Sequence, residues 1–219
     1  MASHQLFMFF LIYCHRPSAL SNEISDNVKV ASLRPSEIAL VQYDSRRLSN
    51  YWLVSAQWNN AYAIHHGHKY IYYNGMNGFC QYSVEEKLAN PWCKVKSMIQ
   101  STEDFPEIKL FIYMDSDAVI DKFFVNVSVN SYLKFFQEKL SWNPFKKPIV
   151  FNQDGPCWWC NLIQKAGYVM CLNAGTVMWY RHPNSAKVLT DWWHSSMDSY
   201  ADNPLKRCQF VFAKMSTSF

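Results

Sequence analysis

The sequence lacks any block of lysine or arginine residues, and it contains little charge of either sign. Charged residues make up 17% of its 219 residues, and the formal net charge is +4. A nucleic-acid-binding protein is therefore not indicated, because such proteins concentrate basic residues to neutralise phosphates. Internal repeats, low-complexity tracts and Gly/Ser linkers are also missing. With 49% hydrophobic residues, the composition excludes disorder and predicts a single folded domain over residues 30–219.

The N-terminal apolar run, residues 6–13, is too short to cross a bilayer as a helix, which needs about 20 residues. Small residues near Ala19 and Ser21 provide a candidate cleavage site, so residues 1–21 are predicted to be a signal peptide or a short signal anchor. This interpretation places the protein in the secretory pathway, with membrane association through the N-terminus if the anchor is retained. A buried first strand is the alternative.

The seven cysteines lack the arrangement of a structural zinc site. Cys157 and Cys160 have metal or redox spacing, but no second Cys/His pair stands at finger-like spacing. A redox motif would open a helix early in its fold, whereas this pair lies late in the chain. Without Cys14, six cysteines remain, which permits up to three disulfides in an oxidising compartment. Structural disulfides or buried thiols are the preferred interpretation, and Asn126 begins a candidate glycosylation sequon.

What the sequence does contain is an alternation of β-prone runs and helical patterns. A strand at 37–43, a helix from Asn50 to about Gly67 and a strand at 69–73 form a βαβ unit, which implies parallel strands. Downstream, the pattern predicts strands at 110–114, 148–151, 168–172 and 176–179, and helices from residue 90, at 132–140 and at 185–197. The chain is thus predicted to form an α/β fold with a mostly parallel sheet flanked by helices. Polar residues follow several of the strands, as a ligand crevice requires.

The most informative polar residues are Asp115, Ser116 and Asp117, which end the apolar run 110–114. Two carboxylates placed two residues apart at the end of a buried strand form a hard oxygen site. Such a site suits Mg²⁺ or Mn²⁺, ions that keep open positions for the phosphates of a substrate. The alternative is a solvated turn, since aspartate is common at turns.

Five short motifs occur in order over about residues 38–195. They are an N-x-x-Y-A segment with a following His-Gly at 59–70, a W-x-K triplet at 92–94, the acidic strand at 111–117, an Asn-x-Gly element that ends in arginine at 172–181, and a helix with tryptophan at 188–192. In this order they resemble the motifs of glycosyltransferase family 34, the Golgi galactosyl-, xylosyl- and mannosyltransferases. The resemblance implies a GT-A fold, in which a Rossmann-like nucleotide-binding sheet is joined to an acceptor-binding half.

The resemblance also implies metal-dependent transfer of a hexose or pentose from a nucleotide diphosphate sugar to a glycan or glycoprotein acceptor in the Golgi lumen or at its membrane. Asp115 and Asp117 would hold Mn²⁺, or Mg²⁺, against the diphosphate. The candidates for donor contact are Lys94, Ser116, Asn173 and Gly175. The alternatives are a solvated helix lysine at position 94 and a bulge or turn around positions 173–175.

Family 34 enzymes retain the anomeric configuration. Retention requires either a carboxylate nucleophile or attack from the same face through an ion-pair-like transition state. Asp154, which precedes Gly155, is the candidate catalytic carboxylate, and a turn-forming aspartate is the alternative interpretation. Asp191 is interpreted as a helix-face residue.

Two other functions stay open. The family continues to an acidic-Gln motif and a distal metal-binding histidine, which residues 203–219 do not resemble, so a truncated pseudoenzyme that binds a glycan or a partner transferase is one alternative. A haloacid-dehalogenase-type phosphatase is the other. Residues 111–120 fit its acidic opening, although that opening normally lies on the first strand of the fold.

Overall fold

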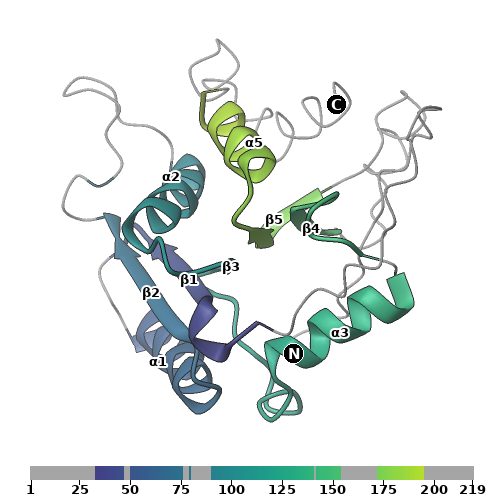
Figure 1. The fold of residues 1–219 in the computed structure, drawn as a ribbon. Helices are drawn as coiled ribbons and strands as arrows, with labels where there is room; N and C mark the ends of the chain where they lie inside the picture. Colours follow the sequence, from purple (N-terminus) through teal and green to yellow (C-terminus); the bar gives the residue numbers. More distant parts are fainter. Residues whose placement is uncertain are drawn as a thin grey trace, which may run out of the picture.

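A computed structural model of the chain describes residues 33–46, 50–75, 79, 90–140, 142–153 and 172–194. Strands and helices alternate along residues 38–153 (Figure 1). The elements are the 3₁₀ helix η1 (Pro35–Glu37), β1 (Ile38–Asp44), α1 (Asn50–His65), β2 (Lys69–Asn74), α2 (Asn90–Asp104), β3 (Leu110–Asp115), α3 (Val129–Leu140), β4 (Ile149–Gln153), β5 (Leu172–Tyr180) and α5 (Pro183–His194). The predicted segment 1–21, the cysteine pair at 157 and 160 and the residues after 194 lie outside the described residues. Within the described ranges, no helix is long and apolar enough to cross a membrane.

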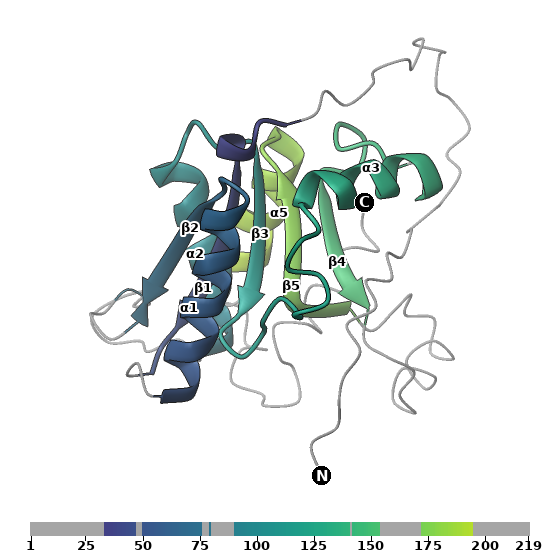
Figure 2. The same cartoon turned by 90° about the horizontal axis from the view of Figure 1, so that it is seen from below.

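The five strands form one sheet in the order β2-β1-β3-β5-β4. β1 pairs in parallel with β2 and β3, whereas β5 is antiparallel to both of its neighbours, β3 and β4. Four strands therefore point the same way, and in Figure 2 the arrowheads of β2, β3 and β4 lie at the same end of the sheet. The predicted α/β class with a mostly parallel sheet is confirmed. The strand end predicted at residue 172 is corrected, because β5 runs from Leu172 through residues 173–175 to Tyr180, and the predicted strand residues 168–171 lie outside the described residues.

The helices cover both faces of the sheet, with α2 and α5 on one face and α1 and α3 on the other (Figure 1). Successive side chains of β3 alternate between the two faces. Phe111 and Tyr113 pack towards α2 and α5, whereas Leu110 and Met114 pack towards α1 and α3. Burial on both faces explains why this strand reads as an uninterrupted apolar run. Phe111 also stacks on Trp179 of β5, with ring centroids 5.1 Å apart.

The predicted end of the first helix at Gly67 is confirmed. Gly67 has φ +70°, a left-handed conformation that glycine adopts at little cost. The N–H of His68 then donates to the carbonyl of Ala63 at 2.8 Å, which satisfies a carbonyl at the end of the helix. The chain therefore leaves α1 directly into β2, and this short connection completes the predicted βαβ unit.

Glu37, next to the start of β1, is expected to make stability depend on pH. Its carboxylate accepts from the side chain and backbone of Arg34 and from Lys109, which lower its pKa to about 2. A depressed carboxyl pKa stabilises the fold above the pKa of the unfolded chain, and that contribution is lost as the pH falls towards about 2. Urea unfolding of Glu37→Gln should show a deficit relative to wild type above about pH 5, and the deficit should shrink towards pH 2. A deficit that stays constant from pH 7 to pH 2 would contradict this assignment.

Candidate active site

The predicted site residues that the structure describes lie at one edge of the sheet. The carboxyl ends of β1, β3 and β4 lie at this edge, and so does the beginning of β5, because β5 runs in the opposite direction. Tyr43 of β1 pairs with Asp115 of β3, and Met114 pairs with Thr176 of β5. The pairing between β4 and β5 shifts here, from Phe151 opposite residue 177 to Asn152 opposite residue 173. Residues 174–176 thus form an irregularity beside Asp115, a common arrangement next to active sites.

Asp115 is held by a lysine from α2. The Nζ of Lys94 donates to Oδ1 at 2.9 Å and to Oδ2 at 3.3 Å, and it also donates to the carbonyl of Ala174 at 3.3 Å. The side chain of Lys94 is 11% exposed and that of Asp115 is 34% exposed, so solvent contacts this ion pair mainly at the carboxylate. The hydroxyl of Tyr113 donates to the same Oδ1 at 3.1 Å. One cation therefore connects α2, β3 and the irregular part of β5.

The second acid lies on a turn that directly follows β3. The N–H of Ala118 donates to the carbonyl of Asp115 at 2.9 Å, which closes a four-residue turn with Ser116 and Asp117 at its centre. Asp117 is exposed. The turn proposed as the alternative interpretation is thus present, and it carries both acids at the edge of the sheet.

The donor set fits a hard divalent cation. Asp115 and Asp117 both offer carboxylate oxygens at the surface. Among the described residues, no group of three or more histidine, cysteine, aspartate or glutamate side chains could hold a metal ion. Two carboxylates are nevertheless what Mg²⁺ commonly takes from a protein, since water and substrate phosphates complete its coordination. These residues therefore suit an ion that is bound together with a phosphate-bearing ligand.

A second charged cluster, which the sequence did not reveal as a unit, adjoins this turn. Asp44, at the end of β1, is buried and accepts from Nε and Nη2 of Arg46, both at 2.9 Å. Burial acts to raise the pKa of Asp44, but the hydrogen bonds from Arg46 outweigh it and the pKa is lowered. The same Nη2 donates to Oγ of Ser116 at 2.8 Å, and the guanidinium lies 3.3 Å from the ring centroid of Trp52. Arg46 therefore links β1 and α1 to the acidic turn. Polar residues after β1 were the only sequence signal for it.

Three predicted residues are placed less completely. Gly175 lies in the irregular segment of β5, beside the carbonyl that Lys94 contacts. Asn173 is placed by its backbone only, opposite Asn152. Asp154, the candidate catalytic carboxylate, lies outside the described residues.

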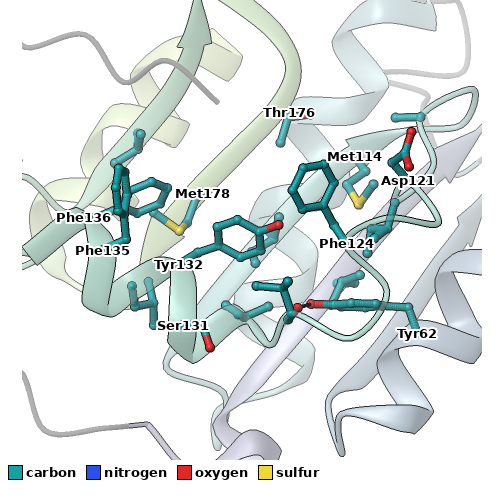
Figure 3. Close-up of a pocket in the computed structure, with 18 of the residues that line it drawn as sticks. Tyr62, Met114, Asp121, Phe124, Ser131, Tyr132, Phe135, Phe136, Thr176 and Met178 are labelled. Carbon is teal, nitrogen blue, oxygen red and sulfur yellow. Dashed lines mark hydrogen bonds between the residues drawn. The ribbon is translucent and has the colours of Figure 1, made fainter. Parts of the chain in front are cut away.

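A cavity of about 460 Å³ lies on the other face of the sheet, beneath α3 (Figure 3). Its lining is largely apolar and includes Phe124, Tyr132, Phe136 and Met178. Met114 also lines it, and because side chains alternate along β3, the cavity lies behind the strand that presents Asp115. Neither Asp115 nor Lys94 belongs to its lining.

Comparison with known proteins identifies the family. The model of the galactosyl transferase GMA12/MNN10 family matches residues 37–211. The chain belongs to this family. The match contains all five motifs and assigns the chain to the glycosyltransferases, enzymes that transfer a sugar from a nucleotide sugar to a glycan acceptor, and not to the dehalogenase-type phosphatases.

Solved structures support the fold assignment of this glycosyltransferase. The chain is similar to the crystal structure of a glycosyltransferase involved in the glycosylation of the major capsid of PBCV-1. The TM-score is 0.56 at 15% sequence identity, over 77% of this chain and 71% of that chain. This likeness shows a shared fold. A search of curated proteins finds no match.

Proposed function

We propose that this glycosyltransferase moves a hexose or pentose from a nucleoside diphosphate sugar to a glycan or glycoprotein acceptor, with Mn²⁺ or Mg²⁺ and with retention of configuration. The observation that carries the proposal is the ion pair of Lys94 with Asp115 at the edge of the sheet. The exposed Asp117 lies two residues further along, in the same turn. A cation and two acids at this position can hold a divalent ion and a diphosphate together.

Each residue has a separate task in this proposal. Asp115 and Asp117 would hold the divalent ion, which when bound supplies Lewis-acid stabilisation of the charge on the departing diphosphate. Lys94 is largely buried, so its charge is little screened and would stabilise negative charge on a phosphate bound beside Asp115. Stabilisation of the leaving group grows as its charge develops, so it raises turnover more than binding. The backbone at Asn173 and Gly175 would contact the donor or acceptor sugar.

Retention is proposed from the family resemblance, with Asp154 as the candidate carboxylate near the anomeric carbon. Asp191 is not a competitor for this role. It forms an ion pair with Lys187 one turn away on α5, as expected for a helix-face residue.

We also propose that the enzyme works in the secretory pathway, in the Golgi lumen or at its membrane. The apolar N-terminal run supports this location. A second support is Cys93, which is buried in α2 and disulfide-bonded. Structural disulfides persist in oxidising compartments such as those of the secretory pathway.

Nucleotide binding tests the proposed site. At least one nucleoside diphosphate of a panel that includes UDP and GDP, at about 100 times its dissociation constant, should raise the melting temperature by about 5 °C or more in Mn²⁺. The rise should be absent in EDTA and should disappear in Asp115→Asn and Asp117→Asn. Asp121→Asn is the matched control, because Asp121 accepts from the N–H of Phe123 through Oδ1, an atom that asparagine keeps. Stabilisation that survives both substitutions would show that the acids do not hold the ion.

A further inference from the structure

We propose that Asn59 of α1 is a positioning residue that fixes the acidic turn for metal binding. The inference rests on the proposed function, because it assumes that Asp115 and Asp117 hold a divalent ion. Asn59 is fully buried, and its side chain makes two hydrogen bonds to the backbone just beyond the turn. Nδ2 donates to the carbonyl of Ala118 at 2.8 Å, and Oδ1 accepts the N–H of Ile120 at 3.1 Å.

The contacts of Asn59 hold the backbone at the end of the turn that carries the two acids. Ala118 closes the turn, because its own N–H donates to the carbonyl of Asp115 at 2.9 Å. The backbone of Ala118 is therefore bonded to Asp115 through its N–H and to α1 through its carbonyl. Any shift of Ala118 must move Ser116 and Asp117, the two residues between these anchored points. Asn59 thereby fixes the position of the two acids relative to the buried face of α1.

Other buried groups support the same backbone. The carbonyl of Ala118 also accepts from Oγ of Ser55 at 3.0 Å. Nε2 of Gln42 donates to the carbonyl of Asp115 at 3.1 Å, while the hydroxyl of Tyr70 donates to Oε1 of Gln42 at 2.6 Å. These contacts leave Asn59 with a distinct part, since a single amide both donates and accepts across the segment 118–120. A side chain of the same size without the amide oxygen would leave the partly buried N–H of Ile120 without this acceptor, whereas the carbonyl of Ala118 would keep the hydroxyl of Ser55.

The same helix contacts the chain further along. Nε1 of Trp58 donates to the carbonyl of Ile120 at 2.7 Å, and the hydroxyl of Tyr62 donates to the carbonyl of Val127 at 2.7 Å. Nε2 of His66 lies 2.7 Å from the carbonyl of Val125. Asn59, Tyr62 and His66 are the polar residues of the first family motif, and all three contact the backbone of the segment after the acids. The geometry thus gives this motif a positioning role.

Metal affinity is sensitive to such support, because ligand oxygens must stay within a few tenths of an ångström of their optimum. Loss of an outer contact that orients a ligand typically weakens metal binding about 10- to 100-fold. Asn59→Ala should therefore raise the dissociation constant for Mn²⁺ about tenfold. Trp58→Phe keeps an aromatic ring at a partly exposed position and removes one hydrogen bond to Ile120, so a weakening of about threefold is expected.

Mn²⁺ binding to the full chain, followed by electron paramagnetic resonance with and without UDP, tests the inference without relying on turnover. Asn130→Ala is the matched control, because Asn130 also donates from its amide to a backbone carbonyl, that of Leu33 at 2.9 Å, away from the acidic turn. This control should lose stability and bind Mn²⁺ as wild type does. If Asn59→Ala does not fold, Trp58→Phe decides the outcome.

The variants of the acids distinguish a failure of the proposed metal site from a failure of the positioning role. If Asp115→Asn and Asp117→Asn bind Mn²⁺ as wild type does, the proposed metal site is wrong and the role of Asn59 falls with it. If those variants lose Mn²⁺ while Asn59→Ala and Trp58→Phe keep wild-type affinity, only the positioning role is wrong. Equal weakening in Asn130→Ala would also overturn it, because general destabilisation would then explain the effect.

Discussion

Replacing Lys94 by methionine should lower the rate of sugar transfer about 100-fold, the usual effect of removing one preorganised electrostatic donor. The substitution removes the cation that lies 2.9 Å from Asp115 and leaves the carboxylate with fewer groups to orient it. It also removes a positive charge from the place where the diphosphate is proposed to leave. Because this charge matters most in the transition state, kcat should fall more than the KM for the donor rises. Transfer of the sugar to water, followed as hydrolysis of the nucleotide sugar at saturating Mn²⁺, measures both kcat and the KM for the donor.

Lys109→Met is the matched control for that experiment. Lys109 also forms an ion pair at 2.9 Å with a largely buried carboxylate, that of Glu37, but it lies at the opposite end of β3. Its loss should reduce stability and leave the kinetic constants near those of wild type. Equal losses of kcat in the two variants would mean that Lys94 acts only through folding.

The order and type of most elements could be predicted from local sequence. The runs at 38–41 and 110–114 are apolar throughout because both faces of β1 and β3 are covered by helices, and such runs identify strands without any knowledge of the partner. The error at β5 has the opposite cause. Asn173 and Gly175 indicated a break between two strands, but pairing with β3 and β4 carries the strand through them with a shift in register. Local propensity contains no information about neighbouring strands.

The candidate site was predictable only in part. The acids and Lys94 could be found because each belongs to a short motif in the sequence. The contacts of Arg46 with Ser116 and of Asn59 with Ala118 join residues that are 70 and 59 positions apart. Such pairings depend on the arrangement of β1, α1 and β3 in space, and no local pattern specifies them. The motifs identify residues of the site, and the structure shows which contacts hold those residues in place.

Arg181 illustrates a motif residue whose structural task the sequence did not indicate. It ends the Asn-x-Gly element and follows β5 directly, and its guanidinium donates three hydrogen bonds to backbone carbonyls around the end of α2. Nε donates to Ile108 at 2.7 Å, and Nη2 donates to Thr102 at 2.8 Å and to Phe105 at 2.6 Å. The last carbonyls of a helix have no partner within the helix, and a cation there also complements the helix dipole.

Arg181→Met should therefore lower the free energy of unfolding by about 3 kcal/mol, because it leaves these carbonyls without their charged donor. Arg181→Lys should recover part of this loss, since a single ammonium keeps the charge but lacks the planar fork that reaches several carbonyls. Urea unfolding followed by far-UV circular dichroism gives the comparison. Lys134→Met is the control, because the side chains of its ion pair with Glu138 are 75% and 57% exposed, and exposed ion pairs contribute about 1 kcal/mol or less. If Arg181→Met and Lys134→Met unfold at the same urea concentration, the anchoring of α2 by Arg181 contributes little, and the other contacts of α2 must hold Lys94 beside Asp115.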